Sequence, residues 1–82
     1  MKILFVIGSV TSASRLKREL YKMGVKNAEV VNTPISISTG GCSYSIEASE
    51  SEKELIYEAA KRRKIKIKGV YREEGERFEN IS

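Results

Sequence analysis

The sequence of 82 residues contains no histidine and only one cysteine, Cys42. Without histidine or a second thiol, no His/Cys cluster has the spacing of metal ligands, and no disulfide can close within the chain. These absences argue against a metal centre and against a disulfide-stapled secreted domain. They leave Cys42 as the one plausible soft nucleophile of the chain.

Long apolar runs are also missing. No run approaches the roughly 18 residues that span a bilayer, and the opening segment 1–7 is too short for a signal peptide. A single cysteine suits a reducing compartment, so we expect a cytoplasmic protein with no membrane segment. The 15 basic and 11 acidic residues give a net charge of +4, which permits an anionic partner without requiring one.

The apolar periodicity predicts six elements of secondary structure. A near-continuous apolar run and three shorter segments are typical of strands, and two amphipathic segments are typical of helices. We expect Thr11 or Ser12 to cap the first helix and Ser49 or Ser51 to cap the second. The predicted strands cover residues 2–7, 28–32, 43–48 and 64–72, and the buried helical positions are Ala13, Leu16, Leu20, Met23, Leu55, Ile56, Ala59 and Ala60.

The order of these elements predicts an α+β, ferredoxin-like βαββαβ fold. In this fold two helices pack on one face of a four-stranded antiparallel sheet, and the first and third strands are neighbours. We expect a single domain over residues 1–72. Residues 73–82 are charged and have no apolar pattern, which predicts a flexible C-terminal tail.

Cys42 follows two glycines in a Ser/Thr/Gly-rich loop. Glycines allow positive φ angles and close approach of other groups, and the predicted topology brings this loop to segment 8–12, where the first helix begins. A helix N-terminus lowers the pKa of a thiol and can hold an anion. The sequence therefore predicts Cys42 as the reactive residue, with binding groups from Ser9, Thr11, Ser12, Thr39, Gly40, Gly41 and Ser43.

Two other interpretations remain open for this loop. An isolated cysteine is often a small buried apolar residue, and the Gly-Gly pair also suits a hairpin turn. The chain would then be a non-enzymatic ligand-binding or partner-binding module with a structural cysteine. Against this, loops of about nine residues in a small domain are frequently functional.

The sequence predicts two surface features in addition to the loop. Lysines and arginines on the last strand form a basic patch, which either protects an edge strand or docks an acidic partner or RNA. RNA binding is disfavoured because the aromatic signature of RNA-binding sheets is absent. An apolar strip on the helix-free sheet face suggests either a homodimer contact or scattered apolar residues. The patch comprises Lys61–Lys64, Lys66, Lys68 and Arg72, and the strip comprises Leu4, Val6, Val31 and Val70.

The chain resembles the selenium/sulfur (Se/S) carrier protein-like family of small bacterial domains over residues 2–72. The matching features are an opening strand that ends in small residues, a helix with an early alanine, and a proline-led loop with a cysteine. Members usually carry cysteine followed by glycine, whereas here the glycines precede Cys42. The strand, helix and loop that match the family are, in order, Phe5-Val6-Ile7-Gly8-Ser9, the helix from Ala13 to Gly24, and Pro34 with Ile37-Ser38-Thr39-Gly40-Gly41-Cys42.

The resemblance implies a carrier function. Cys42 would hold sulfur or selenium as a persulfide or selenosulfide, accept it from a donor protein and present it to an acceptor protein. From the residues themselves we expect no resident cofactor and no metal. The lack of a histidine and of a resolving cysteine fits such a carrier better than an independent enzyme.

Overall fold

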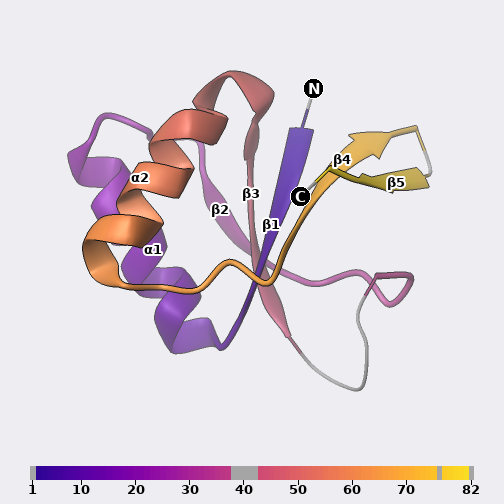
Figure 1. The fold of residues 1–82 in the computed structure, drawn as a ribbon, viewed down its shortest axis with the longest axis horizontal. Coiled ribbons are helices and arrows are strands. Elements are labelled where there is room, and N and C mark those ends of the chain that lie inside the picture. Colours follow the sequence, from indigo (N-terminus) through magenta and orange to yellow (C-terminus); the bar gives the residue numbers. More distant parts are fainter. Residues whose placement is uncertain (1, 38–42, 76, 82) are drawn as a thin grey trace.

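The computed structural model describes residues 2–37, 43–75 and 77–81. Two helices form one layer and cover one face of an antiparallel sheet (Figure 1). In chain order the elements are β1 (Lys2–Gly8), α1 (Val10–Lys22), β2 (Glu29–Asn32), β3 (Tyr44–Ser49), the 3-10 turn η1 (Glu50–Glu52), α2 (Lys53–Arg63), β4 (Gly69–Glu74) and β5 (Arg77–Asn80).

The described sheet has five strands in the order β2-β3-β1-β4-β5. The prediction of a four-stranded ferredoxin-like sheet was therefore wrong, although the α+β class was correct. The fifth strand comes from the charged segment for which the sequence predicted no regular element. It pairs with β4 from Tyr71↔Asn80 to Glu74↔Arg77, around a turn in which Gly75 has a φ of +61°. The strand was missed because backbone hydrogen bonds hold this hairpin together, and a hydropathy pattern carries no information about such bonds.

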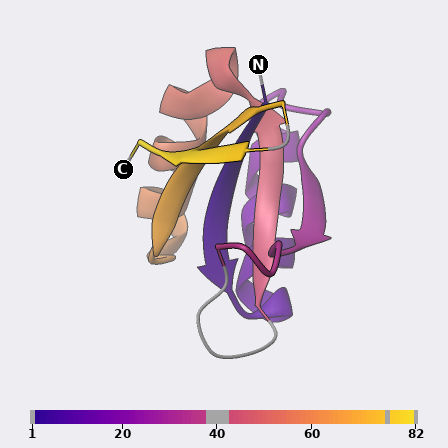
Figure 2. The same ribbon diagram turned by 90° about the vertical axis from the view of Figure 1, so that its right-hand side faces the viewer.

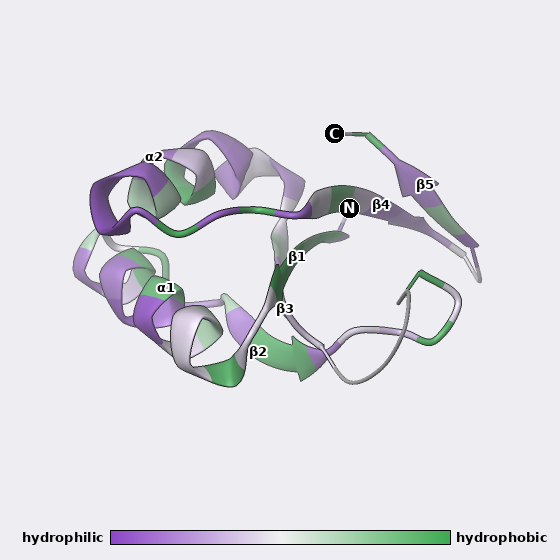
Figure 3. Ribbon diagram, turned by 60° about the horizontal axis from the view of Figure 1, so that its bottom comes forward, coloured by the Kyte–Doolittle hydropathy of each residue, from purple (hydrophilic) through white to green (hydrophobic). Residues whose placement is uncertain are grey.

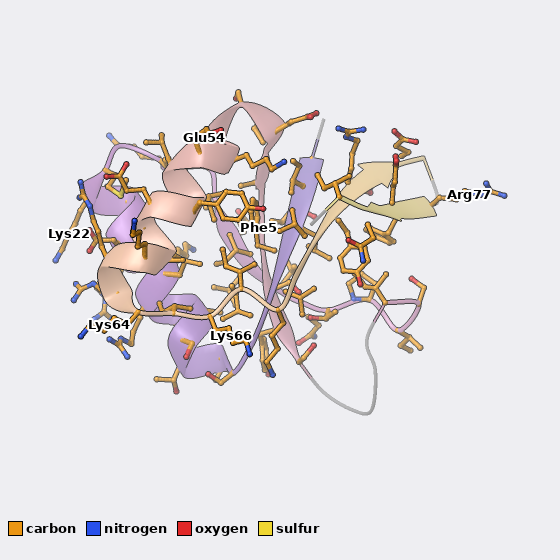
Figure 4. The ribbon with its side chains drawn as sticks, viewed as in Figure 1. Phe5, Lys22, Glu54, Lys64, Lys66 and Arg77 are labelled. Carbon is orange, nitrogen blue, oxygen red and sulfur yellow. The ribbon has the colours of Figure 1, made fainter. Side chains whose placement is uncertain are left out.

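The core lies between the central strand β1 and the two helices. Ile3, Phe5 and Ile7 alternate toward the helices, and Phe5 is fully buried (Figure 4). The colouring of Figure 3 shows β1 as an apolar strand, whereas the outer turns of both helices are polar. The helices contribute Ala13, Leu16, Leu20, Ile56, Ala59 and Ala60 to the core, and Met23 is partly buried against it.

The start of each helix differs from its prediction. Ser9 caps α1, because its Oγ accepts a hydrogen bond from the Ser12 N–H at 3.1 Å. In the second helix, the turn η1 separates Ser49 from α2, and no side-chain hydrogen bond caps either segment. Leu55 is 38% exposed, so the buried stripe of α2 is narrower than expected. Gly24, with a φ of +94°, follows the end of α1 and its C-cap Met23.

The predicted last strand is shorter than expected. Residues 65–68 are not in a strand, although Ile65 and Ile67 pack against the core. Strand β4 lies between β1 and β5, so the lysines before it do not protect an edge strand. Arg72 does not belong to the predicted basic patch, because its guanidinium forms ion pairs with Glu50, Glu74 and Glu79 at 3.1, 3.7 and 3.8 Å.

The predicted apolar strip is not formed. Val70 pairs with Phe5 on the helix side of the sheet and is only 1% exposed. Leu4 is also buried, at 4% exposure, although it alternates with Phe5 and faces away from the helices. The strip therefore supplies no continuous exposed surface for a dimer contact.

Candidate functional site

The end of β1 and the start of β3 lie side by side at the end of the sheet where α1 begins (Figure 1). Gly8 pairs with Tyr44, and a register shift between Val6 and Gly8 marks an irregularity in the strand. The Thr33 N–H donates a hydrogen bond to the Ser43 carbonyl at 2.9 Å. This bond joins the two ends of the loop that contains Cys42, at the sheet end where α1 begins.

A buried pair of hydroxyl groups supports the entry to this loop. The Oγ1 of Thr33 lies 2.6 Å from the Oγ of Ser45, and Ser45 is fully buried. Segment 33–37 passes over the helix-free face of the sheet, in front of β3 (Figure 2). One hydroxyl donates and the other accepts, so this hydrogen bond offsets part of the cost of burying the pair.

Lys68 lies directly against Gly8. A Cβ atom built on Gly8 would lie 2.9 Å from Nζ of Lys68 and 3.2 Å from its Cε, and Gly8 has a φ of +114°. The Lys68 N–H also donates to the Val6 carbonyl at 2.8 Å, which holds the segment beside β1. Glycine is needed at position 8 for its backbone angle, whereas the flexible end of the Lys68 side chain can move away from a Cβ atom.

The first turn of α1 adds further positive potential. The Ala13 N–H donates to the Ser9 carbonyl, and the Ser12 N–H donates to the Ser9 side chain. The N–H groups of Val10 and Thr11 have no acceptor among the described residues, as expected at a helix start. No acidic residue lies in this turn, so the helix dipole and Lys68 act together without a local carboxylate.

The structure brings together four of the predicted site residues. Ser9 and Ser12 form the cap, Thr11 is exposed in the same turn, and Ser43 lies beside Thr33 at the same sheet end. The Ser9 oxygen already accepts the capping bond. The remaining predicted residues, namely Thr39, Gly40, Gly41 and Cys42, lie outside the described residues.

The sequence analysis missed the position of Lys68 and the Thr33–Ser45 pair. It placed Lys68 on the exposed face of a long last strand. The position of Lys68 could have been predicted from the antiparallel pairing of the first and last strands. In such a pair, the residues just before the last strand lie beside the end of the first strand. Nothing in the local pattern predicts the hydroxyl pair, because segment 33–37 folds over the sheet only in the tertiary structure.

Within the described ranges, no group of three or more His, Cys, Asp or Glu residues could hold a metal ion. No described helix is long and apolar enough to cross a membrane.

Comparison with known families identifies the chain's relatives. The family model named "Putative Se/S carrier protein-like" matches residues 2–72. The chain belongs to this family. Among curated proteins no match was found. The matched range includes Cys42, Gly8 and Lys68, whereas β5 lies beyond it.

Proposed function

We propose that this member of the Se/S carrier protein-like family carries sulfur or selenium on Cys42. The observation that supports this function is the family match, which spans the loop with the only thiol of the chain. In the loading step, the Cys42 thiolate attacks the outer chalcogen atom of a persulfide or selenosulfide on a donor protein. The donor thiolate leaves, Cys42 holds the chalcogen, and an acceptor thiolate later reverses the exchange.

The described surroundings suit such an exchange. The start of α1 and the Lys68 ammonium place positive potential beside Gly8, and we propose that they favour the Cys42 thiolate and the terminal anion of its persulfide. Among the residues that the structure describes, we propose that Thr11, Ser12 and Ser43 donate hydrogen bonds to the chalcogen on Cys42. Ser9 holds the shape of the turn through its capping bond. From the sequence alone, we propose Thr39, Gly40 and Gly41 as further binding groups of the same site.

We propose a carrier that acts with partners in the cytoplasm, and not an independent enzyme. A lone cysteine, which can form no disulfide within the chain, suits a reducing compartment. The chain has no histidine that could act as a general base and no second cysteine to resolve a disulfide. The proposed partners are therefore a chalcogen donor protein and an acceptor protein.

A loading and transfer experiment tests this function. The purified protein is treated with a persulfide donor, freed of excess donor, mixed with a low-molecular-weight thiol and followed by mass spectrometry. We expect the mass to rise by one sulfur atom and to return when the thiol takes that atom. A protein that stays unlabelled, or that keeps the sulfur in the presence of excess acceptor, would instead be a binding module with a structural cysteine.

Replacement of Lys68 by alanine is expected to slow the alkylation of Cys42 at neutral pH. The ammonium beside Gly8 is exposed, and exposed charge pairs are worth less than about 1 kcal/mol, so the alkylation profile should move about half a unit to higher pH. The rate of reaction with iodoacetamide is measured across the pH range.

Lys61→Ala is the matched control, because Lys61 is an exposed lysine near the end of α2 and the variant has the same net charge. Its alkylation profile should equal that of the parent. Identical profiles for the Lys68→Ala variant and the parent would show that this ammonium does not act on the thiol.

A further inference from the structure

An open groove runs between α1 and the edge strand β2. Its volume is about 530 Å³, and its walls are Val10, Ser14, Lys17, Arg18, Tyr21 and Val30. The five helical residues recur at helical spacing and form one continuous stripe along α1. At one end, Val10 follows the Gly8–Ser9 turn of the candidate site.

The groove is apolar at its ends and basic in its middle. Val10 and Tyr21 are 47% and 61% exposed, and Lys17 and Arg18 are exposed as well. No carboxylate is among the residues that form the walls. Neither Lys17 nor Arg18 forms an ion pair within the described part of the chain.

The acidic residue of α1 cannot neutralise these two cations. Glu19 has a side chain that is only 13% exposed, and it contacts Arg63 at 3.0 Å and Arg62 at 3.7 Å. Its negative charge is therefore neutralised by arginines of α2. The stripe that faces β2 keeps an uncompensated positive charge beside exposed apolar side chains.

Strand β2 leaves one edge of the sheet open (Figure 2). In an antiparallel pair, residues alternate between those that bond to the neighbouring strand and those that point away from it. The bond from the Thr33 N–H to the Ser43 carbonyl sets this alternation. Val30 and Asn32 therefore direct their N–H and C=O groups toward the open edge, beside the groove.

We propose that this groove binds an extended acidic segment of a partner protein, which adds to β2 as a further strand. Main-chain hydrogen bonds to Val30 and Asn32 would supply affinity, as in other cases of strand addition. Carboxylates of the segment would pair with Lys17 and Arg18, and its apolar side chains would contact Val10 and Tyr21. An apolar wall and a free strand edge suit a polypeptide better than a nucleic acid, which binds through phosphates. The proposal does not require Cys42 to be reactive.

The probe is a synthetic peptide, Glu-Thr-Val-Thr-Glu-Thr-Val-Thr-Glu, with both ends blocked. It carries alternating carboxylate and apolar side chains on one face of an extended strand. The full protein, with a reductant and no chalcogen, is titrated with this peptide and followed by amide NMR shifts. We expect the largest shifts at Val10, Val30 and Asn32, and weaker binding as the salt concentration rises.

Two matched comparisons decide the outcome. The Lys17→Glu/Arg18→Glu variant should bind the peptide about tenfold more weakly or worse, whereas Lys53→Glu/Lys61→Glu, with the same net charge, should bind it like the parent. A peptide methylated on alternate backbone nitrogens removes the donors that pair with β2. Binding of this peptide to the unaltered protein should be lost, and this comparison stands even where a charge variant fails to fold.

Several outcomes would overturn the proposal. Shifts confined to another surface, or equal peptide affinity in both double variants, would exclude the groove. Undiminished binding of the methylated peptide would exclude strand addition. Tighter binding of single-stranded oligo-dT than of the peptide at these same amides would make the groove a nucleic-acid site.

Discussion

The Cys42→Ser variant is expected to take up no sulfur or selenium from a persulfide or selenosulfide donor. Cys42 is the only thiol of the chain, and the thiolate is the nucleophile in chalcogen exchange. A serine hydroxyl stays protonated at neutral pH and cannot replace it. Mass spectrometry after treatment with the donor should show complete loading of the parent and no mass increase in the variant.

The matched control moves the thiol without removing it. In the Cys42→Ser/Ser51→Cys variant the new thiol lies on η1, at the sheet end opposite Gly8, and Ser51 is exposed between Glu50 and Glu52. These carboxylates disfavour a thiolate, so we expect loading at neutral pH to be about tenfold slower than in the parent. Equal rates in the two proteins would mean that any exposed thiol suffices, and the special role of the loop would be lost.

The Phe5→Ala variant is expected to lose about 3–5 kcal/mol of folding free energy, because a fully buried phenylalanine leaves a cavity in the centre of the core. Phe5 is 0% exposed and lies between its strand neighbours Ile46 and Val70. Its ring also meets the Tyr57 ring edge to face, with centroids 5.7 Å apart. Domains of this size have about 4–12 kcal/mol of stability in total, so the loss is a large share of it. Urea denaturation measures the change.

Ile35→Ala provides the matched control for this loss. Ile35 is an apolar residue that is 93% exposed, and its truncation should change the free energy of unfolding by less than about 0.5 kcal/mol. Phe5→Leu keeps much of the buried volume and should fall between the two variants. A loss below about 1 kcal/mol for Phe5→Ala would be inconsistent with the central position of this ring.

The helices and the first four strands could be recognised from the chain because their apolar periodicity is strong. Ala13, Leu16 and Leu20 recur at helical spacing and are all buried. The alternation around Ile46 likewise predicted β3. These features depend on nearest neighbours along the chain, which a sequence shows directly.

The errors occurred where pairing between distant residues decides the structure. The fifth strand has a charged sequence, and β4 becomes an interior strand only through its pairing with β5. Arg72 was predicted to belong to a basic patch, yet its register places it among Glu50, Glu74 and Glu79. Register is a tertiary property, and a shift of one residue moves a side chain to the other face.

The sequence by itself determined that the chain has one thiol, that this thiol follows two glycines in a Ser/Thr-rich loop, and that the loop joins two strands of an α+β domain. Composition and local periodicity are sufficient for these conclusions. Only the tertiary structure decided that Lys68 lies against Gly8 and that α1 and β2 form a basic groove. Both features join residues that are far apart in the chain, and they arise because the strands pair and the helices pack on one face of the sheet.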